Sequence, residues 1–393
     1  MAAEIFDFDT LTDRRSTYAS KWEIGEGELP MWIADMDFKA APAIRAALQR
    51  RLDNGIFGYT EIPDVWYEAY MGWWKTRHHL AIQKESLVFC TGVIPAISTA
   101  VRKLTTPAEN VLILTPVYNI FYNSILNNGR RVLESQLICE DGAYRIDWAD
   151  FEEKLADPQT SLMIFCNPHN PVGKIWDKET LQKIGALCEK YGVTVISDEI
   201  HCDITDPGKE YVPFASASET CARISVTCIA PTKCFNLAGL QTAAVMVPDP
   251  FLRHKMWRGL NTDEVAEPNA FAIDAATAAF NEGGPWLDAM RAYTKKNKDI
   301  VRSAVKRDLP QLCITDSEAT YLLWIDCGAA IDAAGLKDSR ELAAALRKKT
   351  GLILSDGCQY GPGGERFLRM NTACPRSVLE DGLARFIRGM SAL

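Results

Sequence analysis

Three segments of this 393-residue chain carry side chains whose types could do chemistry together. Asn170, Asp198 and Lys233 follow one another along the chain and supply an amide, a carboxylate and an amine. Their segments are Asn167-Pro-His-Asn-Pro-Val-Gly173, Ser197-Asp-Glu-Ile-His201 and Ala230-Pro-Thr-Lys-Cys-Phe-Asn-Leu-Ala-Gly-Leu240. Pyridoxal 5′-phosphate needs these three groups: a donor to its ring oxygen, a carboxylate for its ring nitrogen and an amine for its aldehyde. The ordered set predicts an enzyme that uses this cofactor.

Two of these residues also have purely local explanations. Asp198 follows an apolar run, where an unpaired buried carboxylate costs several kcal/mol and a protonated pyridine nitrogen would be a suitable partner. A helix N-cap is the alternative for this aspartate. Asn170 could be only a turn residue beside Pro171, although its amide could also donate to the cofactor's phenolate oxygen. Because all three groups occur together, we favour the interpretation that they bind the cofactor.

The neighbours of Lys233 set it apart from most lysines, which are solvated surface groups. Phe235 and Leu237 make its surroundings apolar, and Gly239 permits close packing. An amine that is desolvated there and faces a cationic ring would have a lowered pKa. Lys233 is therefore expected to act both as a nucleophile and as a base.

A phosphate site is predicted where a strand-like run gives way to a helix-like one. The backbone N–H groups of Gly92, Val93 and Ile94 would point at an anion from the positive end of that helix. The hydroxyl of Thr232 would assist them, although a single glycine in such a place is a weak signal by itself.

Four further side chains are candidates with competing explanations. Tyr118 could stack on a planar ring or only pack. Tyr59 could reach a phosphate and substrate from a neighbouring subunit, or be a core or interface tyrosine. Arg369, in the strand-like run Arg366–Met370, could form a two-pronged bond with a carboxylate or a structural salt bridge. His201, three residues after Asp198, could contact the ring region or be a satisfied core or surface histidine.

The elements that must position these residues alternate between strands and helices, which predicts an α/β fold with a mostly parallel sheet. Gly92, Tyr118, Asn170, Asp198 and Lys233 fall at or just after strand ends, at the carboxyl edge where open α/β sheets bind ligands. We predict strands at 87–90, 111–114, 162–166, 193–197 and 224–229, with helices at 94–104 and 178–191.

The chain is expected to contain three regions. Residues 1–45 lack the large-domain pattern and are predicted to be an arm associated with the smaller domain. Residues 46–285 form the large domain, and 286–393 form a separate, smaller α+β domain. The smaller domain is expected to have helices at 286–306 and 340–349 and strands at 321–325 and 366–370.

Composition and charge narrow the class of protein. Hydrophobic residues make up 47% and charged residues 24%, as in ordinary globular proteins. A net charge of −8 opposes binding to nucleic acid or anionic membranes and favours a small-molecule ligand. No window approaches the ~18 apolar residues of a membrane span, and the acidic N-terminus lacks signal-peptide features, so a cytoplasmic protein is expected.

The remaining metal-ligand types do not form a recognisable site in the sequence. The twelve cysteines are scattered without Cys-x-x-Cys spacing and are expected to be reduced core residues. His78 and His79 lie in a polar stretch without metal-ligand spacing to a cysteine or an acid, so we expect surface positions and no metal.

Taken together, these segments resemble fold-type I pyridoxal-phosphate enzymes of the aspartate-aminotransferase superfamily, over nearly the whole chain. Five segments are similar to the MalY/PatB branch of cystathionine β-lyases: Leu29-Pro-Met-Trp-Ile-Ala-Asp-Met-Asp-Phe38, Thr91-Gly-Val-Ile-Pro-Ala96, 167–173, Asp198-Glu-Ile-His201 and Arg369-Met-Asn-Thr-Ala-Cys-Pro-Arg376. The resemblance implies a seven-stranded, mostly parallel sheet flanked by helices, and a homodimer with shared active sites.

Carried over residue by residue, the resemblance also implies roles. Lys233 would hold the cofactor, Asp198 its ring nitrogen, Asn170 its phenolate oxygen and Tyr118 its ring face. Gly92, Val93 and Thr232 would hold the phosphate, Tyr59 would arrive from the second subunit, and Arg369 would bind the substrate's α-carboxylate.

The chain departs from the wider superfamily at three positions. Aminotransferases often carry tyrosine where His201 stands, arginine where Gln241 stands, and a hydroxyl residue where Ala230 stands. Because Gln241 replaces that arginine, one positively charged partner of the cofactor phosphate is missing. Tyr59 therefore becomes more important for binding the phosphate. These differences favour the lyase branch and leave the substrate open.

The resemblance thus implies a carbon–sulfur β-lyase that cleaves L-cystathionine and related cysteine S-conjugates to a thiol, pyruvate and ammonia. An aminotransferase would use the same groups and is the first alternative. A regulatory protein that binds a protein partner and keeps the cofactor as a structural ligand is the second, and direct DNA binding is not expected because no helix-turn-helix region is appended.

Overall fold

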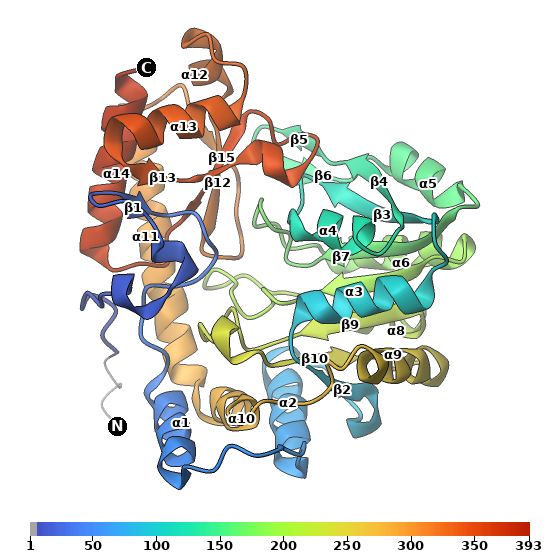
Figure 1. Ribbon diagram of the computed structural model, residues 1–393. Helices are drawn as coiled ribbons and strands as arrows, with labels where there is room; N and C mark the ends of the chain where they lie inside the picture. Colours follow the sequence, from blue (N-terminus) through green and yellow to red (C-terminus); the bar gives the residue numbers. More distant parts are fainter. Residues whose placement is uncertain (1–5) are drawn as a thin grey trace.

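A seven-stranded sheet forms the centre of the larger part of the molecule (Figure 1). The computed structural model describes residues 6–393. The strand order is β2-β10-β9-β8-β7-β3-β4, and every pairing is parallel except the two that β10 makes. The strands are β2 (Leu87–Cys90), β3 (Asn110–Thr115), β4 (Arg131–Gln136), β7 (Thr160–Cys166), β8 (Thr194–Asp198), β9 (Ser225–Ile229) and β10 (Ala243–Met246).

The predicted fold class is confirmed, and the five predicted strands are found within two residues of their expected bounds. Two strands of this sheet, β4 and β10, were not predicted. β10 is a four-residue run of small and apolar side chains, and β4 is an edge strand that carries arginine, glutamate and glutamine. Neither has the long apolar run that marks a buried parallel strand.

Helices cover both faces of the sheet because successive strand residues point to opposite sides. Val111 and Ile113 pack against one group of helices, and Leu112 and Leu114 pack against the other. The first group is α3 (Val93–Leu104), α4 (Ile120–Leu126) and α9 (Pro250–Thr262). The second is α5 (Trp148–Ala156), α6 (Lys178–Lys190), α7 (Phe214–Ala217) and α8 (Glu219–Ile224).

A third packed group lies beyond β2 and β10 and consists of α1 (Pro42–Asn54), α2 (Asp64–Arg77) and α10 (Ala272–Glu282). The long helix α11 (Gly284–Asp308) follows and runs away from this group toward the C-terminal elements (Figure 1). Its buried Lys298 donates to Asp206 Oδ1 at 2.6 Å and to Ser317 Oγ at 3.0 Å. This buried ion pair ties α11 to the loop that follows β8.

The C-terminal elements build a second, smaller sheet with its own core. The antiparallel order is β11-β12-β15-β14, with β11 (Cys313–Ile314), β12 (Leu322–Asp326), β14 (Ser355–Asp356) and β15 (Phe367–Asn371). The accompanying helices are α12 (Gly328–Ala333), α13 (Ser339–Thr350) and α14 (Arg376–Ser391). A separate hairpin pairs β5 (Ile138–Glu140) with β6 (Ala143–Arg145).

The N-terminal arm crosses onto this smaller sheet region. Strand β1 (Leu29–Pro30) pairs in parallel with β13 (Leu352–Ile353), and the chain after β1 then passes between the two halves of the molecule. Residues 1–5 of the predicted arm lie outside the described residues. In residues 6–393, no helix is long and apolar enough to cross a membrane.

Candidate active site

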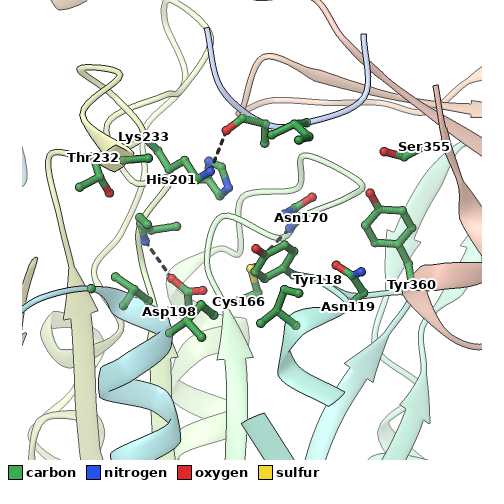
Figure 2. A pocket seen from close by; sticks show the side chains of 18 of the residues that line it. Tyr118, Asn119, Cys166, Asn170, Asp198, His201, Thr232, Lys233, Ser355 and Tyr360 are labelled. Carbon is green, nitrogen blue, oxygen red and sulfur yellow. Dashed lines mark hydrogen bonds between the residues drawn. The ribbon is translucent and has the colours of Figure 1, made fainter. Parts of the chain in front are cut away.

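A cavity of about 440 Å³ opens at the carboxyl ends of the parallel strands, where the larger sheet meets the C-terminal elements and the arm (Figure 2). All of the predicted site residues except Tyr59 line it. They are Gly92, Val93, Ile94, Tyr118, Asn170, Asp198, His201, Thr232, Lys233 and Arg369. Residues that are up to 277 positions apart in sequence, such as Gly92 and Arg369, therefore share one cavity.

Lys233 lies in the tight turn that follows β9, and its side chain points into the cavity. Its Nζ donates a hydrogen bond to the Ala34 carbonyl oxygen at 2.7 Å. Burial lowers the pKa of Lys233 to about 8, and Arg369 adds to this effect, while Asp35 and Asp198 oppose it. An amine with such a pKa is available as a base near neutral pH.

Asp198 is the last residue of β8 and is 4% exposed. Its Oδ1 accepts from the backbone N–H of Ile200 at 3.1 Å, but residues 200–203 form turns and no helix begins there. Burial raises the pKa of Asp198 to about 7, although Ile200 and Lys233 both act in the opposite direction. A cationic partner in the cavity would hold this carboxylate ionised.

Arg369 is buried in the middle of β15, opposite Trp324 on β12. Its Nη1 donates to Asn170 Oδ1 at 3.0 Å and its Nη2 to the Trp32 carbonyl at 2.9 Å. The bond to Arg369 uses the amide oxygen of Asn170, so the amide N–H₂ remains as the donor for a ligand. The guanidinium also lies over the ring of Tyr360, 4.9 Å from its centroid.

The predicted anion site has the required backbone. Gly92 is the N-cap of α3, and Val93 and Ile94 are its first two residues. Their N–H groups have no partner within the helix because they lie in its first turn. Thr232 is buried next to Lys233 and lines the same cavity.

Tyr118 and His201 contribute an aromatic face and a neutral imidazole. Tyr118 follows β3, and its ring lines the cavity together with Asn170 (Figure 2). His201 is 3% exposed, and its Nδ1 has no hydrogen-bond partner among the described residues. Burial lowers the pKa of His201 to about 3, with further contributions from Lys233 and Arg369, so the ring is neutral at physiological pH.

Tyr59 lies apart from the cavity and is fully exposed in the single chain. It belongs to the irregular segment between α1 and α2, with Ile56 72% exposed and Phe57 52% exposed. The single chain therefore does not bring Tyr59 to the other site residues.

The expectation that His78 is a surface residue is wrong. His78 caps the end of α2 and turns inward, so that its side chain is 7% exposed and its Nε2 lies 2.9 Å from Asp203 Oδ1. Burial alone would raise the pKa of Asp203, but the contacts with His78 and Trp73 bring it below its ordinary value. The pairing joins residues 125 positions apart and so could not be seen as a local spacing.

Comparison with known proteins identifies the family. The family model for aminotransferases of class I and II matches residues 31–386. The chain is 44% identical to cystathionine beta-lyase PatB of Bacillus subtilis over 98% of this chain and all of that protein, and 33% identical to protein MalY of Escherichia coli over 99% and all of it. The chain belongs to the aminotransferase class I and II family, in its MalY/PatB branch.

A solved structure in this family gives the same fold. The PLP-bound C-S lyase of Staphylococcus hominis superposes with a TM-score of 0.93 at 32% identity, over 99% of both chains. The predicted fold type is thus confirmed.

The cavity of this family member fits pyridoxal phosphate by the chemistry of its own donors. Asp198 has too few partners for a buried carboxylate, and the first turn of α3 presents backbone N–H groups. The amine, the amide donor and the aromatic face stand around the same space. These residues supply each contact that the ring nitrogen, phosphate, phenolate oxygen and aldehyde require.

Sequence reasoning missed several residues of the cavity wall. Trp32, Ile33 and Ala34 come from the arm, Asn119 follows Tyr118, and Ser355, Gln359 and Tyr360 come from β14 and the short turn after it. The motif Leu29–Phe38 and the glycine-rich turn after Tyr360 were visible signals. Their side chains, however, have no reactive type that points to chemistry on its own.

The pKa of Lys233 can be tested directly. In the cofactor-free, full-length protein we expect the Lys233 amine to be half deprotonated at about pH 8. Lys209 lies at the surface, where Glu318 raises its pKa, so its amine should stay protonated to higher pH than that of Lys233. Competitive acetylation across a pH series, followed by mass spectrometry of the peptides, measures both amines. Equal titration midpoints for Lys233 and Lys209 would contradict the burial argument.

Proposed function

We propose that this protein is a pyridoxal-phosphate-dependent carbon–sulfur β-lyase that cleaves L-cystathionine and related cysteine S-conjugates. The observation that carries the proposal is the joint presence of Lys233, Asp198 and Arg369 around one buried cavity. The cofactor is held by Lys233 through its amine, and Asp198, Asn170, Tyr118, Thr232 and the first turn of α3 surround it. His201 contributes a neutral ring to the same wall.

The residues of the chain have distinct tasks in this reaction. Pyridoxal phosphate, when bound, supplies an electron sink for the charge that develops at the substrate's Cα. Arg369 holds the substrate α-carboxylate, and the freed Lys233 amine removes the Cα proton. Asp198 stabilises a positive charge at the ring nitrogen, because a buried carboxylate favours a cation beside it. The Cβ–sulfur bond then breaks, the thiolate leaves, and hydrolysis yields pyruvate and ammonia.

The charge of the cavity favours a substrate with one carboxylate near the reacting carbon. Arg369 is the single arginine among the described residues that line the cavity. An aminotransferase for acidic amino acids would need a second cation for the distal carboxylate. Gln241, at the cavity edge, is neutral. This argument disfavours transamination of acidic amino acids. No particular contact favours the regulatory role with a protein partner.

We also propose a homodimer in which Tyr59 completes the active site of the neighbouring subunit. The exposed apolar side chains Ile56 and Phe57 beside Tyr59 are typical of an interaction surface. A tyrosine hydroxyl would replace part of the phosphate contact that the neutral Gln241 cannot make.

We further propose a cytoplasmic location, because all twelve cysteines are free and most of them are buried.

The reaction type is tested by the products. With L-cystathionine and no added keto acid, we expect equal amounts of pyruvate, ammonia and homocysteine, and little amino-group transfer. The Lys233→Ala variant is the control and should give none of these products. If product formation requires 2-oxoglutarate or pyruvate as an amino acceptor and releases no thiol, the protein is an aminotransferase.

The role of Arg369 is tested by a change that keeps its charge. Arg369→Lys loses the two-pronged geometry, so kcat/KM should fall by about 10- to 100-fold for every α-amino acid substrate. Arg376→Lys is the matched control, because Arg376 belongs to the same motif but lies over the ring of Tyr293 outside the cavity. A loss confined to one thioether would instead assign Arg369 to side-chain recognition.

The role of Tyr59 is tested with mixed dimers of Tyr59→Phe and Lys233→Ala chains. If Tyr59 acts across the interface, one site of each mixed dimer contains both native residues, and activity should return to about half of the wild-type value. The two parent homodimers, separated by different affinity tags, provide the baseline. Mixed dimers no more active than those parents would place Tyr59 outside the neighbouring site.

A further inference from the structure

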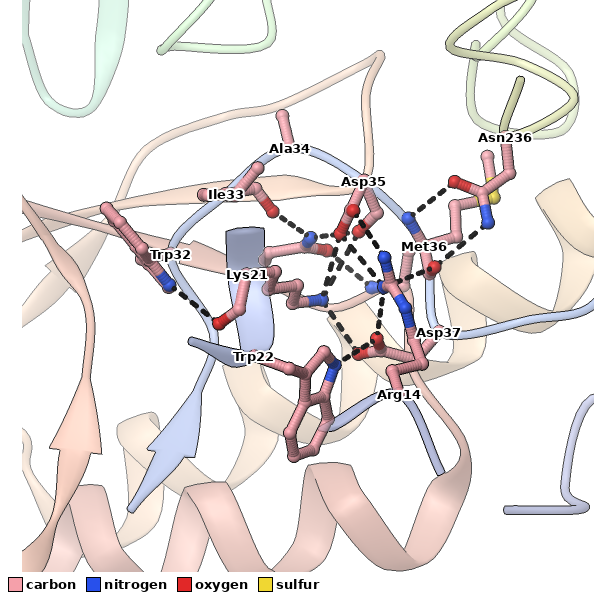
Figure 3. Close-up of polar contacts among 12 residues, drawn as sticks. Arg14, Lys21, Trp22, Trp32, Ile33, Ala34, Asp35, Met36, Asp37 and Asn236 are labelled. Atoms are coloured by element: carbon pink, nitrogen blue, oxygen red, sulfur yellow. Dashed lines mark hydrogen bonds and ion pairs between the residues drawn. The ribbon is translucent and has the colours of Figure 1, made fainter. Parts of the chain in front are cut away.

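The arm segment Trp32–Asp37 contributes residues 32–34 to one wall of the active-site cavity, and many of the contacts that hold the segment are made to its backbone (Figure 3). Each carbonyl from Trp32 to Met36 accepts at least one side-chain hydrogen bond. The donors are Arg369 and Ser355 to Trp32, Asn371 to Ile33, Lys233 and Tyr321 to Ala34, Asn371 and Lys21 to Asp35, and Asn236 and Arg14 to Met36. The position of this backbone is therefore specified along its whole length.

A buried charge network holds the side of the segment that faces away from the cavity. Asp37 is 6% exposed and Lys21 is 1% exposed, and Lys21 Nζ lies 2.7 Å from Asp37 Oδ2. Arg14 Nη1 lies 2.7 Å from Asp37 Oδ1 and its Nη2 lies 2.8 Å from Asp35 Oδ2. The Trp22 indole N–H donates to Asp37 Oδ1 at 2.9 Å. Removing one partner from such a network leaves a buried charge unpaired, so the backbone around it should loosen.

The Ala34 carbonyl connects this network with Lys233. Its oxygen accepts from Lys233 Nζ at 2.7 Å and from the Tyr321 hydroxyl at 3.1 Å. A neutral amine has two N–H bonds and one lone pair, and a fixed acceptor for one N–H restricts the directions in which the lone pair points. Orientation of a base in this way contributes to the rate of proton transfer.

We propose that Lys21 and Asp37 are positioning residues that hold the Ala34 carbonyl in place, and that this carbonyl aims the free Lys233 amine at the substrate's Cα. The proposal deepens the proposed function and rests on Lys233 being the base. Neither Lys21 nor Asp37 lines the cavity, so they act through the backbone of the arm segment.

The titration of Lys233 separates positioning from simple electrostatics. The charged or titratable groups that face its amine are Asp198 at the end of β8, His201 in the loop after it, Arg369 on β15 and Asp35 in the arm segment. A fixed carbonyl stabilises the ammonium form and therefore raises the pKa of Lys233. When the carbonyl is loosened, the pKa should fall. Removing the positive charge of Lys21 without loosening would instead raise it.

The decisive variants are Lys21→Met and Asp37→Asn, which keep side-chain size. Positioning predicts that both lower the titration midpoint of Lys233, measured by competitive acetylation of the full-length, cofactor-free protein. Electrostatics alone predicts opposite directions, upward for Lys21→Met and downward for Asp37→Asn. An upward or absent shift in Lys21→Met overturns the proposal.

The holoenzyme provides a second measurement. We expect kcat with L-cystathionine to fall by about tenfold or more, while KM changes by less than about threefold, because orientation of the base matters only after the substrate is bound. The acidic limb of the pH profile of kcat should move to lower pH in both variants. An equal loss through KM alone would contradict the proposal.

Two further variants keep the test interpretable. Asp288→Asn removes an ion pair with Arg77 between α11 and α2, away from the arm segment, and should change neither titration nor kcat. If the network variants do not fold, Tyr321→Phe removes only the second donor to the Ala34 carbonyl; an unchanged kcat and pH profile would then overturn the proposal. The wild-type protein could give no lyase products while Lys21→Met still lowers the titration midpoint of Lys233. That result would reject the proposed reaction and would support the positioning of the Lys233 amine.

Discussion

Burial of ionisable groups in one cavity is the constraint on which the rest of this structure depends. The charged side chains of Lys233, Asp198 and Arg369 would each have a lower free energy in water, yet all three line the same cavity. The pKa of Lys233 falls and that of Asp198 rises, both chiefly because of burial. The sheet, the C-terminal elements and the arm each deliver part of this set. The fold therefore shields these groups from water and holds them at fixed separations.

The sequence was sufficient for the residues that come from the carboxyl ends of the parallel strands. Asn170, Asp198 and Lys233 have reactive side chains, follow recognisable strands and retain their order along the chain, so their convergence followed from topology. The predicted strands and the α/β class were confirmed for the same reason. Short or polar strands such as β4 and β10 were missed because they lack an apolar run.

Other parts of the site could not be predicted, because they depend on long-range packing. Ala34 contributes a backbone carbonyl, which every residue has, and Tyr360 contributes a ring beneath Arg369. The pairing of His78 with Asp203 likewise joins segments with no shared local pattern. Tyr59 differs again: its proposed partner is another chain, so neither the local pattern nor the single-chain structure places it in a site.

The course of the chain through the site has a consequence for protein synthesis. The arm segment emerges from the ribosome before Lys233, and Tyr321 and Arg369 emerge after it. Since domains fold in the order in which they are made, the parallel sheet can form while the cavity still lacks one wall. The acceptor that faces Lys233 can be fixed only when β12 and β15 have appeared. The Ala34 carbonyl therefore cannot be held by Tyr321, nor the Trp32 carbonyl by Arg369, until these two strands have been made.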